Sequence, residues 1–194
     1  MILKKKSTII VGMKGSGKST LAHFIASQPQ YKTLIYDTIH EFPTNNIPYD
    51  LYRPKDRYSL DELVRLIDLK IKNKRAYDLL IIDEANRFIP GGGKTLDRRI
   101  VDLNDIQRHP PYEIGTIWLA RRPTQLHPDV VGLADNIICF MLTGRNDTDY
   151  LNDIKRGLGD EVARLKPFYA IVFSKGQIDY IPPIEIDSVW KSRQ

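Results

Sequence analysis

Three glycines, two lysines and three hydroxyl side chains interrupt an apolar sequence at IIVGMKGSGKST, residues 9–20. Gly12, Gly17, Lys18 and Ser19 match the spacing G-x-x-x-x-G-K-[ST], in which a curled backbone directs successive N–H groups at phosphate oxygens. The spacing predicts a phosphate-binding loop; the alternative is a glycine-rich turn without a ligand. The residues expected to bind the nucleotide are Gly12, Met13, Lys14, Gly15, Ser16, Gly17, Lys18, Ser19 and Thr20.

The sequence on either side of this loop supports the prediction. STIIVG reads as a buried strand and STLAHFIA as the helix that follows it, and a helix N-terminus adds partial positive charge beside a phosphate. Lys18 is expected to reach the β- and γ-phosphates of ATP, and the Ser19 hydroxyl is expected to hold Mg²⁺. ATP and Mg²⁺ are therefore the expected cofactors.

A second group of reactive side chains follows an apolar run in YDLLIIDEANRF, residues 77–88. The run predicts a buried strand that delivers Asp83 and Glu84 to the carboxyl edge of the sheet, where α/β proteins bind ligands. Asp83 would accept a hydrogen bond from a Mg²⁺-bound water or the Ser19 hydroxyl, and Glu84 would polarise a water for attack on the γ-phosphate. The alternative is that the two carboxylates only cap the next helix. With the upstream loop, the pair predicts hydrolysis.

The elements that must position these residues alternate between strands and helices, which predicts an α/β fold with a doubly wound, mainly parallel sheet. The clearest helix is SLDELVRLIDLKIKNKR, which Ser59 and Glu62 begin with a predicted capping box. Residues 38–58 read as an extended connection, and the C-terminal residues as a β-hairpin at the sheet edge. The expected strands are residues 7–12, 33–37, 78–83, 115–120, 136–142 and 169–174.

Length and composition suit one soluble domain. The 194 residues are 42% hydrophobic and 27% charged, so we expect residues 1–194 to form a single ATPase domain. The longest apolar run, IICFML, is too short to span a membrane, and Cys139 within it is expected to be a reduced core residue of a cytoplasmic protein. The net charge of +5 leans only weakly towards an acidic partner.

Several classes of phosphate-loop protein do not fit. A small GTPase would carry D-x-x-G and N-K-x-D where this chain has DEAN and GRND. An AAA-type ATPase would carry a helical C-terminal lid, and a nucleoside or metabolite kinase an arginine-rich lid; neither lid is recognised in this sequence. The remaining class is RecA-like, with an additional strand between those of the phosphate loop and Asp83. Its sheet order is 5-1-4-3-2, and many of its members are oligomeric motors.

LLIIDEA, followed by DIQRHPPYEIGTIWLARRPTQLHPDVVGLADNIICFMLTGRNDTDYL at residues 105–151, resembles the FtsK–HerA superfamily of DNA-pumping ATPases. Within it, the short chain is most similar to the genome-packaging ATPases of tailless double-stranded DNA viruses with an internal membrane. The resemblance implies a ring of identical subunits that moves double-stranded DNA irrespective of its sequence. It also implies a capsid vertex as partner, and a location in the host cytoplasm or the virion.

Three arginines are candidates for roles at the site, and the resemblance suggests two of them. Arg108 matches the family's arginine before an apolar strand and would reach a neighbouring subunit's γ-phosphate, an arrangement worth about 10³–10⁵ in rate. Arg145 is a second candidate. Where the family has Gln-Arg-Pro, this chain has Arg121-Arg122-Pro123, so Arg121 would contact phosphate as a charged donor. Each of the three could instead be a surface residue.

Two further segments are candidate contact sites. In IPGGGKTLDRR, residues 89–99, three glycines precede Lys94, Arg98 and Arg99, which suits a loop that follows a DNA backbone without reading bases; the alternative is a solvent-exposed loop without a function. The family's C-terminal segment implies that Pro182 and Pro183 pack on the adenine ring.

The alternatives to viral packaging are of two kinds. Within the superfamily they are a cellular or plasmid DNA pump of the HerA or conjugation type, and the assembly ATPase of filamentous phages, which usually carries a transmembrane segment. Outside it they are a small-molecule kinase and a nucleotide-gated scaffold.

Overall fold

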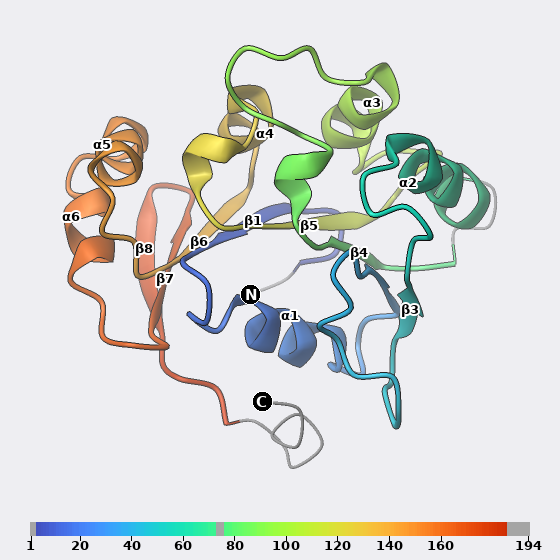
Figure 1. Ribbon diagram of the computed structural model, residues 1–194, viewed down its shortest axis with the longest axis horizontal. Helices are drawn as coiled ribbons and strands as arrows, with labels where there is room; N and C mark the ends of the chain where they lie inside the picture. The colour runs from blue at the N-terminus through green and yellow to red at the C-terminus, as the bar shows by residue number, and fades with distance from the viewer. Residues whose placement is uncertain (1–2, 73–75, 186–194) are drawn as a thin grey trace.

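Eight strands form one sheet in the computed structural model, which describes residues 3–72 and 76–185 (Figure 1). Their order across the sheet is β3-β2-β4-β5-β1-β6-β7-β8. The strands are β1 (Ser7–Val11), β2 (Thr33–Tyr36), β3 (Asp50–Tyr52), β4 (Leu79–Ile82), β5 (Gly115–Ala120), β6 (Asn136–Phe140), β7 (Ala170–Ser174) and β8 (Gln177–Ile181).

The sheet confirms the predicted mainly parallel α/β fold. β1 to β6 pair in parallel, and β7 and β8 add the predicted antiparallel hairpin at one edge. When β1, β2, β4, β5 and β6 are numbered one to five, their order is 5-1-4-3-2. The prediction that residues 38–58 form only a connection was wrong, because Asp50–Tyr52 pairs with β2 as an additional edge strand.

Helices cover both faces of this sheet (Figure 1). α1 lies on one face, and α2 to α6 lie on the other. The helical segments are α1 (Lys18–Ala26), α2 (Leu60–Leu66), η1 (Ile67–Lys72), η2 (Ala85–Arg87), α3 (Arg98–Ile106), η3 (Pro123–Gln125), α4 (Pro128–Gly132), α5 (Arg145–Ile154) and α6 (Leu158–Ala163).

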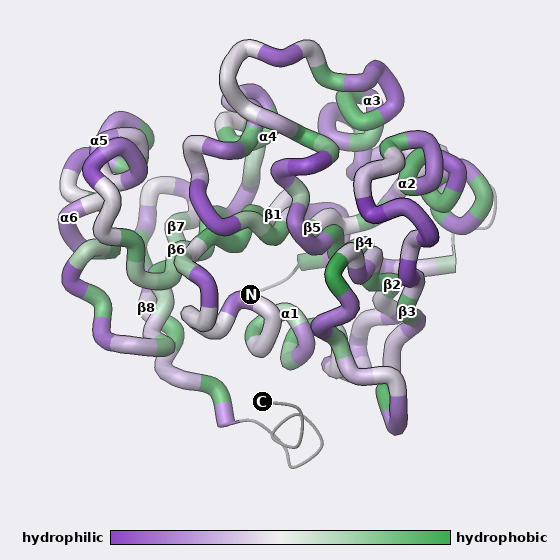
Figure 2. The backbone as a smooth tube through the Cα atoms, in the orientation of Figure 1, coloured by the Kyte–Doolittle hydropathy of each residue, from purple (hydrophilic) through white to green (hydrophobic). Residues whose placement is uncertain are grey.

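Each face of the sheet has its own hydrophobic core. Under α1, Leu21 and Ile25 pack with the fully buried Ile10 of β1; on the other face, Leu63 and Leu103 join the core around Trp118. The central strands are the most apolar segments of the backbone (Figure 2). Burial of such side chains contributes about 1.5–3 kcal/mol each, which fixes the strand ends that carry the polar residues.

The predicted capping box is only half formed. The Ser59 hydroxyl accepts a hydrogen bond from the Glu62 N–H over 3.2 Å, but the Glu62 carboxylate does not reach back to Ser59. It accepts hydrogen bonds from the Tyr52 hydroxyl at 2.7 Å and the Lys55 N–H at 3.0 Å instead, because β3 brings these residues beside the helix. α2 then continues as the π-helical η1, and residues 73–75 at the predicted helix end lie outside the described residues.

No helix of the described ranges is both long and apolar enough to cross a membrane. Cys139, in β6, is fully buried as predicted, and burial raises the pKa of its thiol to about 12.

Candidate nucleotide-binding site

The predicted phosphate-binding loop connects β1 to α1 at the carboxyl edge of the sheet, and α1 begins at Lys18. Two glycines are required by space and backbone geometry. A Cβ on Gly12 would lie 2.6 Å from the Cβ of Phe140. Gly17 has a φ of 108°, and a Cβ there would lie 3.1 Å from the Phe140 ring. Phe140, the last residue of β6, thus leaves no room for a side chain at Gly12 and little at Gly17 in the curled loop.

The Lys18 side chain spans this loop. Its ammonium group donates hydrogen bonds to the carbonyl oxygens of Gly12 at 2.7 Å and Met13 at 2.9 Å. Partial burial lowers the pKa of Lys18, and the nearby carboxylates of Asp83, Glu41 and Glu84 oppose that shift. The Lys18 ammonium group is therefore held beside the loop backbone, where it would contact the phosphates of a bound triphosphate.

The Ser19 hydroxyl donates a hydrogen bond to Glu41 over 2.9 Å. Asp83 was expected to accept a hydrogen bond from a Mg²⁺-bound water or from this hydroxyl. The hydroxyl bonds to Glu41, from the connection between β2 and β3, so contact of Asp83 with a Mg²⁺-bound water stays a prediction. Sequence reasoning missed Glu41. The signal was its position, since it is an acidic residue shortly after the strand that pairs with β4.

Asp83 follows β4 directly and is 6% exposed. Its Oδ1 accepts a hydrogen bond from the Glu84 N–H at 2.9 Å, whereas its Oδ2 has no hydrogen-bond partner among the described residues. Burial, reinforced by the charge of Glu41, raises the pKa of Asp83 to about 7. A buried carboxylate oxygen without a donor near a serine hydroxyl fits a Mg²⁺ ion, which prefers oxygen ligands.

Glu84, the predicted base, forms an ion pair with Arg121. The Arg121 Nη2 lies 2.9 Å and its Nε 3.1 Å from the same carboxylate oxygen. Glu84 has a left-handed backbone with φ 46° and is 8% exposed, so the turn after β4 presents its side chain at the strand end. The predicted contact of Arg121 with phosphate stays a prediction, because in this structure its partner is Glu84.

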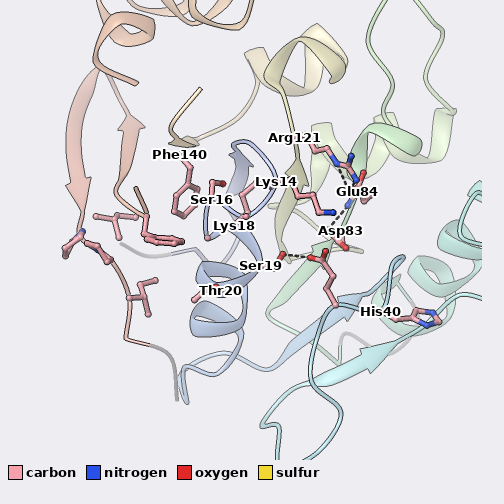
Figure 3. Close-up of a pocket in the computed structure, with 18 residues that line it drawn as sticks. Lys14, Ser16, Lys18, Ser19, Thr20, His40, Asp83, Glu84, Arg121 and Phe140 are labelled. Carbon is pink, nitrogen blue, oxygen red and sulfur yellow. Dashed lines mark hydrogen bonds and ion pairs between the residues drawn. The ribbon is translucent and has the colours of Figure 1, made fainter. Parts of the chain in front are cut away.

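These residues line one cavity of about 800 Å³. Figure 3 shows Lys18, Ser19, Asp83, Glu84 and Arg121 projecting into a common space beside the loop. The other end of the cavity is apolar, and sequence reasoning found only its two prolines; it is lined by Phe140, Phe168, Ile181, Pro182, Pro183 and Ile184.

Among the described residues, no group of three or more His, Cys, Asp and Glu side chains is arranged to hold a metal by itself. In nucleotide sites Mg²⁺ is commonly bound by one or two protein groups together with substrate phosphates. Ser19 and Asp83 would hold the ion.

Arg108 lies away from this cavity. Its guanidinium pairs with Asp135 at 2.8 Å, and Asp135 also accepts a hydrogen bond from the N–H of Ser7, the first residue of β1. Because Ser7 begins the strand whose other end carries the phosphate loop, Arg108 lies at the opposite edge of the sheet. Arg145 begins α5, where its side chain is 92% exposed and pairs with Asp149 over 3.5 Å.

The glycine-rich loop connects η2 to α3, on the face opposite α1 (Figure 1). Lys94, Arg98 and Arg99 are all exposed, as a DNA contact requires. Arg99 differs from the other two, because it pairs with Asp97 at 2.8 Å and with Asp61 at 3.2 Å. DNA contact by these residues stays a prediction.

The fold is similar to that of known packaging proteins. The chain aligns with the genome packaging NTPase B204 from Sulfolobus turreted icosahedral virus 2, solved in complex with ATP-gammaS, at a TM-score of 0.81 and 20% identity, covering 95% of this chain and 100% of B204. This chain has the fold of that packaging NTPase. It is also similar to the conjugation coupling protein TcpA of pCW3, at a TM-score of 0.65 and 15% identity, covering 98% of this chain and 66% of TcpA.

A sequence relative points the same way. The probable DNA double-strand break repair helicase HerA of Methanocaldococcus jannaschii is 28% identical over an alignment of 119 residues that covers 57% of this chain and 23% of HerA. The chain thus spans about a quarter of the length of that curated relative. No protein-family model matches the chain. With B204, the HerA match confirms the predicted resemblance to the FtsK–HerA superfamily.

Proposed function

We propose that this chain is an ATP-hydrolysing translocase of double-stranded DNA that packages a viral genome. The observation that carries the proposal is the convergence of Lys18, Ser19, Asp83 and Glu84 on one cavity. The likeness to B204, over 95% of this chain and 100% of B204, supports the viral role. The likenesses to HerA and TcpA make a cellular or plasmid DNA pump the second candidate.

Each residue of the cavity has a distinct task in this proposal. The loop N–H groups and Lys18 bind the β- and γ-phosphates, and the apolar end of the cavity holds the adenine ring. Ser19 and Asp83 would hold Mg²⁺, which would supply positive charge to neutralise the phosphates. Glu84 accepts a proton from the attacking water. Because Arg121 occupies an oxygen of Glu84, this ion pair opens before that oxygen acts as the base.

We further propose that the active site is completed by a neighbouring subunit in a ring. Arg108 is exposed at the edge of the sheet remote from its own phosphate loop, so it is available to another subunit rather than to its own site. A guanidinium can meet the γ-phosphate oxygens of the transition state with several N–H donors.

The test is hydrolysis of ATP with and without long double-stranded DNA. A translocase should be stimulated by DNA of unrelated sequences alike, and the stimulation should fall steeply with salt, because the contacts are to phosphates. Phosphoryl transfer to a small molecule, with no response to DNA, would instead identify a kinase. A capsid-protein gene next to the coding sequence would favour packaging over a cellular pump.

A further inference from the structure

Glu41 stands next to the hydroxyl that the phosphate-loop motif reserves for the cation. Its carboxylate Oε2 accepts a hydrogen bond from the Ser19 hydroxyl over 2.9 Å, and both side chains line the nucleotide cavity. A serine that binds a cation does so through an oxygen lone pair, so its proton needs a separate acceptor. In this chain the acceptor is Glu41 rather than Asp83.

Hydrogen bonds from Asp37 and Arg53 hold the backbone around Glu41 in place. Asp37 is fully buried and accepts hydrogen bonds from the N–H groups of Glu41 at 3.0 Å and Phe42 at 3.4 Å. Arg53 donates to Asp37 at 3.1 Å and to the Phe42 carbonyl at 2.8 Å. Phe42 itself is 0% exposed, in the core under α1. These contacts fix the base of the Glu41 side chain, which is exposed towards the cavity.

A second observation at the same place points to a ligand. Asp83 Oδ2 is buried without a hydrogen-bond partner among the described residues, and Asp83 lines the same cavity. Asp37 and Asp83 each follow the last residue of a strand, and those residues, Tyr36 and Ile82, are partners in the parallel pairing of β2 and β4. The ends of β2 and β4 therefore place Glu41 and Asp83 at the same carboxyl edge of the sheet as Ser19.

We propose that Glu41 is a positioning residue for the divalent cation of the nucleotide site. By accepting a hydrogen bond from the Ser19 hydroxyl, it turns a lone pair of the hydroxyl oxygen towards the cation. This inference rests on the proposed function of the cavity. Partners of this kind are typically worth about 10–100-fold in metal affinity.

The experiment measures binding of ATP-γS by calorimetry, in EDTA and across a Mg²⁺ titration. Glu41→Gln keeps a hydrogen-bonding group of the same shape but no longer offers a carboxylate. It should bind ATP-γS in EDTA at least as tightly as the wild type, and it should need about 10–100-fold more Mg²⁺ to reach half of the Mg²⁺-dependent gain. Glu113→Gln, the same change beside Lys5 at the opposite sheet edge, should match the wild type.

A double-mutant cycle separates positioning from general disturbance of the site. If Glu41 acts through Ser19, Glu41→Gln should have little further effect on the Mg²⁺ requirement in a Ser19→Ala background. An unchanged Mg²⁺ requirement in Glu41→Gln, or full additivity with Ser19→Ala, would overturn the proposal. A wild type that binds ATP-γS without any Mg²⁺-dependent gain would also overturn it, and a wild type that binds no ATP-γS, with or without Mg²⁺, would refute the nucleotide site itself. A Mg²⁺ gain with no response to DNA would refute the translocase and leave the role of Glu41 standing.

Discussion

The guanidinium of Arg121 donates two hydrogen bonds to one carboxylate oxygen of Glu84, over 2.9 Å and 3.1 Å. The Arg121 side chain is 52% exposed and the Glu84 side chain 10%, so the pair connects a solvent-exposed residue to a buried one. It restrains the side chain that the proposed mechanism uses as a base. Solvent screening limits the strength of such a half-exposed pair to the lower range for ion pairs, about 0.2–1 kcal/mol.

The FtsK–HerA superfamily carries glutamine where this chain has Arg121. Replacing Arg121 by glutamine should free the Glu84 carboxylate from its ion pair. We expect Arg121→Gln to raise DNA-independent ATP hydrolysis up to about five-fold, which corresponds to breaking a pair worth at most about 1 kcal/mol. Arg122→Gln is the matched control, since Arg122 pairs with Asp147 at 2.7 Å and not with Glu84. A steady-state phosphate-release assay measures both. A large loss of activity in Arg121→Gln would show instead that Arg121 acts on the phosphate.

Lys18 and Glu84 should fail in different ways. Lys18→Ala should abolish binding of ATP, because the phosphates lose the cation held at the loop. Glu84→Gln should keep ATP bound and lower turnover by at least about a hundredfold, because only the proton acceptor is removed. Calorimetric binding and phosphate release, measured on both variants, separate the two defects. Near wild-type hydrolysis by Glu84→Gln would mean that another group is the base.

The glycine-rich loop should act on DNA and not on ATP. Replacing Lys94, Arg98 and Arg99 together by alanine should weaken DNA binding and lower its salt dependence, while hydrolysis without DNA stays unchanged. Arg99 should contribute least, because it is already paired with Asp97 and Asp61. Arg156→Ala, an exposed arginine between α5 and α6, serves as the control in a fluorescence-anisotropy titration. Normal DNA binding by the triple variant would contradict the assignment.

Cys139 offers a probe of stability. Because its thiol is fully buried and its pKa is raised to about 12, a thiol reagent at neutral pH should react only when the fold opens. Saturating ATP-γS with Mg²⁺ should slow the reaction of the wild type, since a ligand that binds the folded state stabilises it. The same addition should have no effect on Lys18→Ala. Rapid labelling of the native protein would contradict the burial of β6.

Local motifs made much of this site predictable. The spacing in residues 12–19 predicts a loop, and the apolar run before Asp83 predicts a strand that ends beside it. The sequence alone therefore predicted that Lys18, Ser19, Asp83 and Glu84 lie together, and all four line one cavity. Glu41 was not predicted, because its place depends on the pairing of β2 with β4 and on the buried Asp37. Only the tertiary structure brings these together.

The same distinction explains the errors in the fold. β1, β5 and β6 are continuous apolar runs, and their predicted bounds agree with the structure to within two residues. The three-residue β3 has no such run, since Asp50 is exposed, and its pairing with β2 defines it. That strand also draws the Glu62 carboxylate away from Ser59, which no local capping pattern could indicate.

We expect the active site to be shared between subunits. Arg108→Ala should leave the fold intact, because Asp135 keeps Lys6 at 3.0 Å and the Ser7 N–H at 2.9 Å as partners. It should nevertheless lower hydrolysis by about 10³-fold or more if Arg108 completes a neighbour's site. Specific activity of the wild type should also rise with protein concentration as subunits assemble.

Mixing two inactive variants tests this directly. Arg108→Ala subunits keep Glu84, and Glu84→Gln subunits keep Arg108, so some interfaces of a mixed ring contain both intact groups. We expect the mixture to recover part of the wild-type rate, whereas Arg108→Ala mixed with an Arg108→Ala, Glu84→Gln double variant should recover none. Phosphate release is measured after co-assembly is verified by light scattering. If both variants assemble and bind ATP but the mixture stays inactive, Arg108 does not act across the interface, and the exposed Arg145 is tested in the same way.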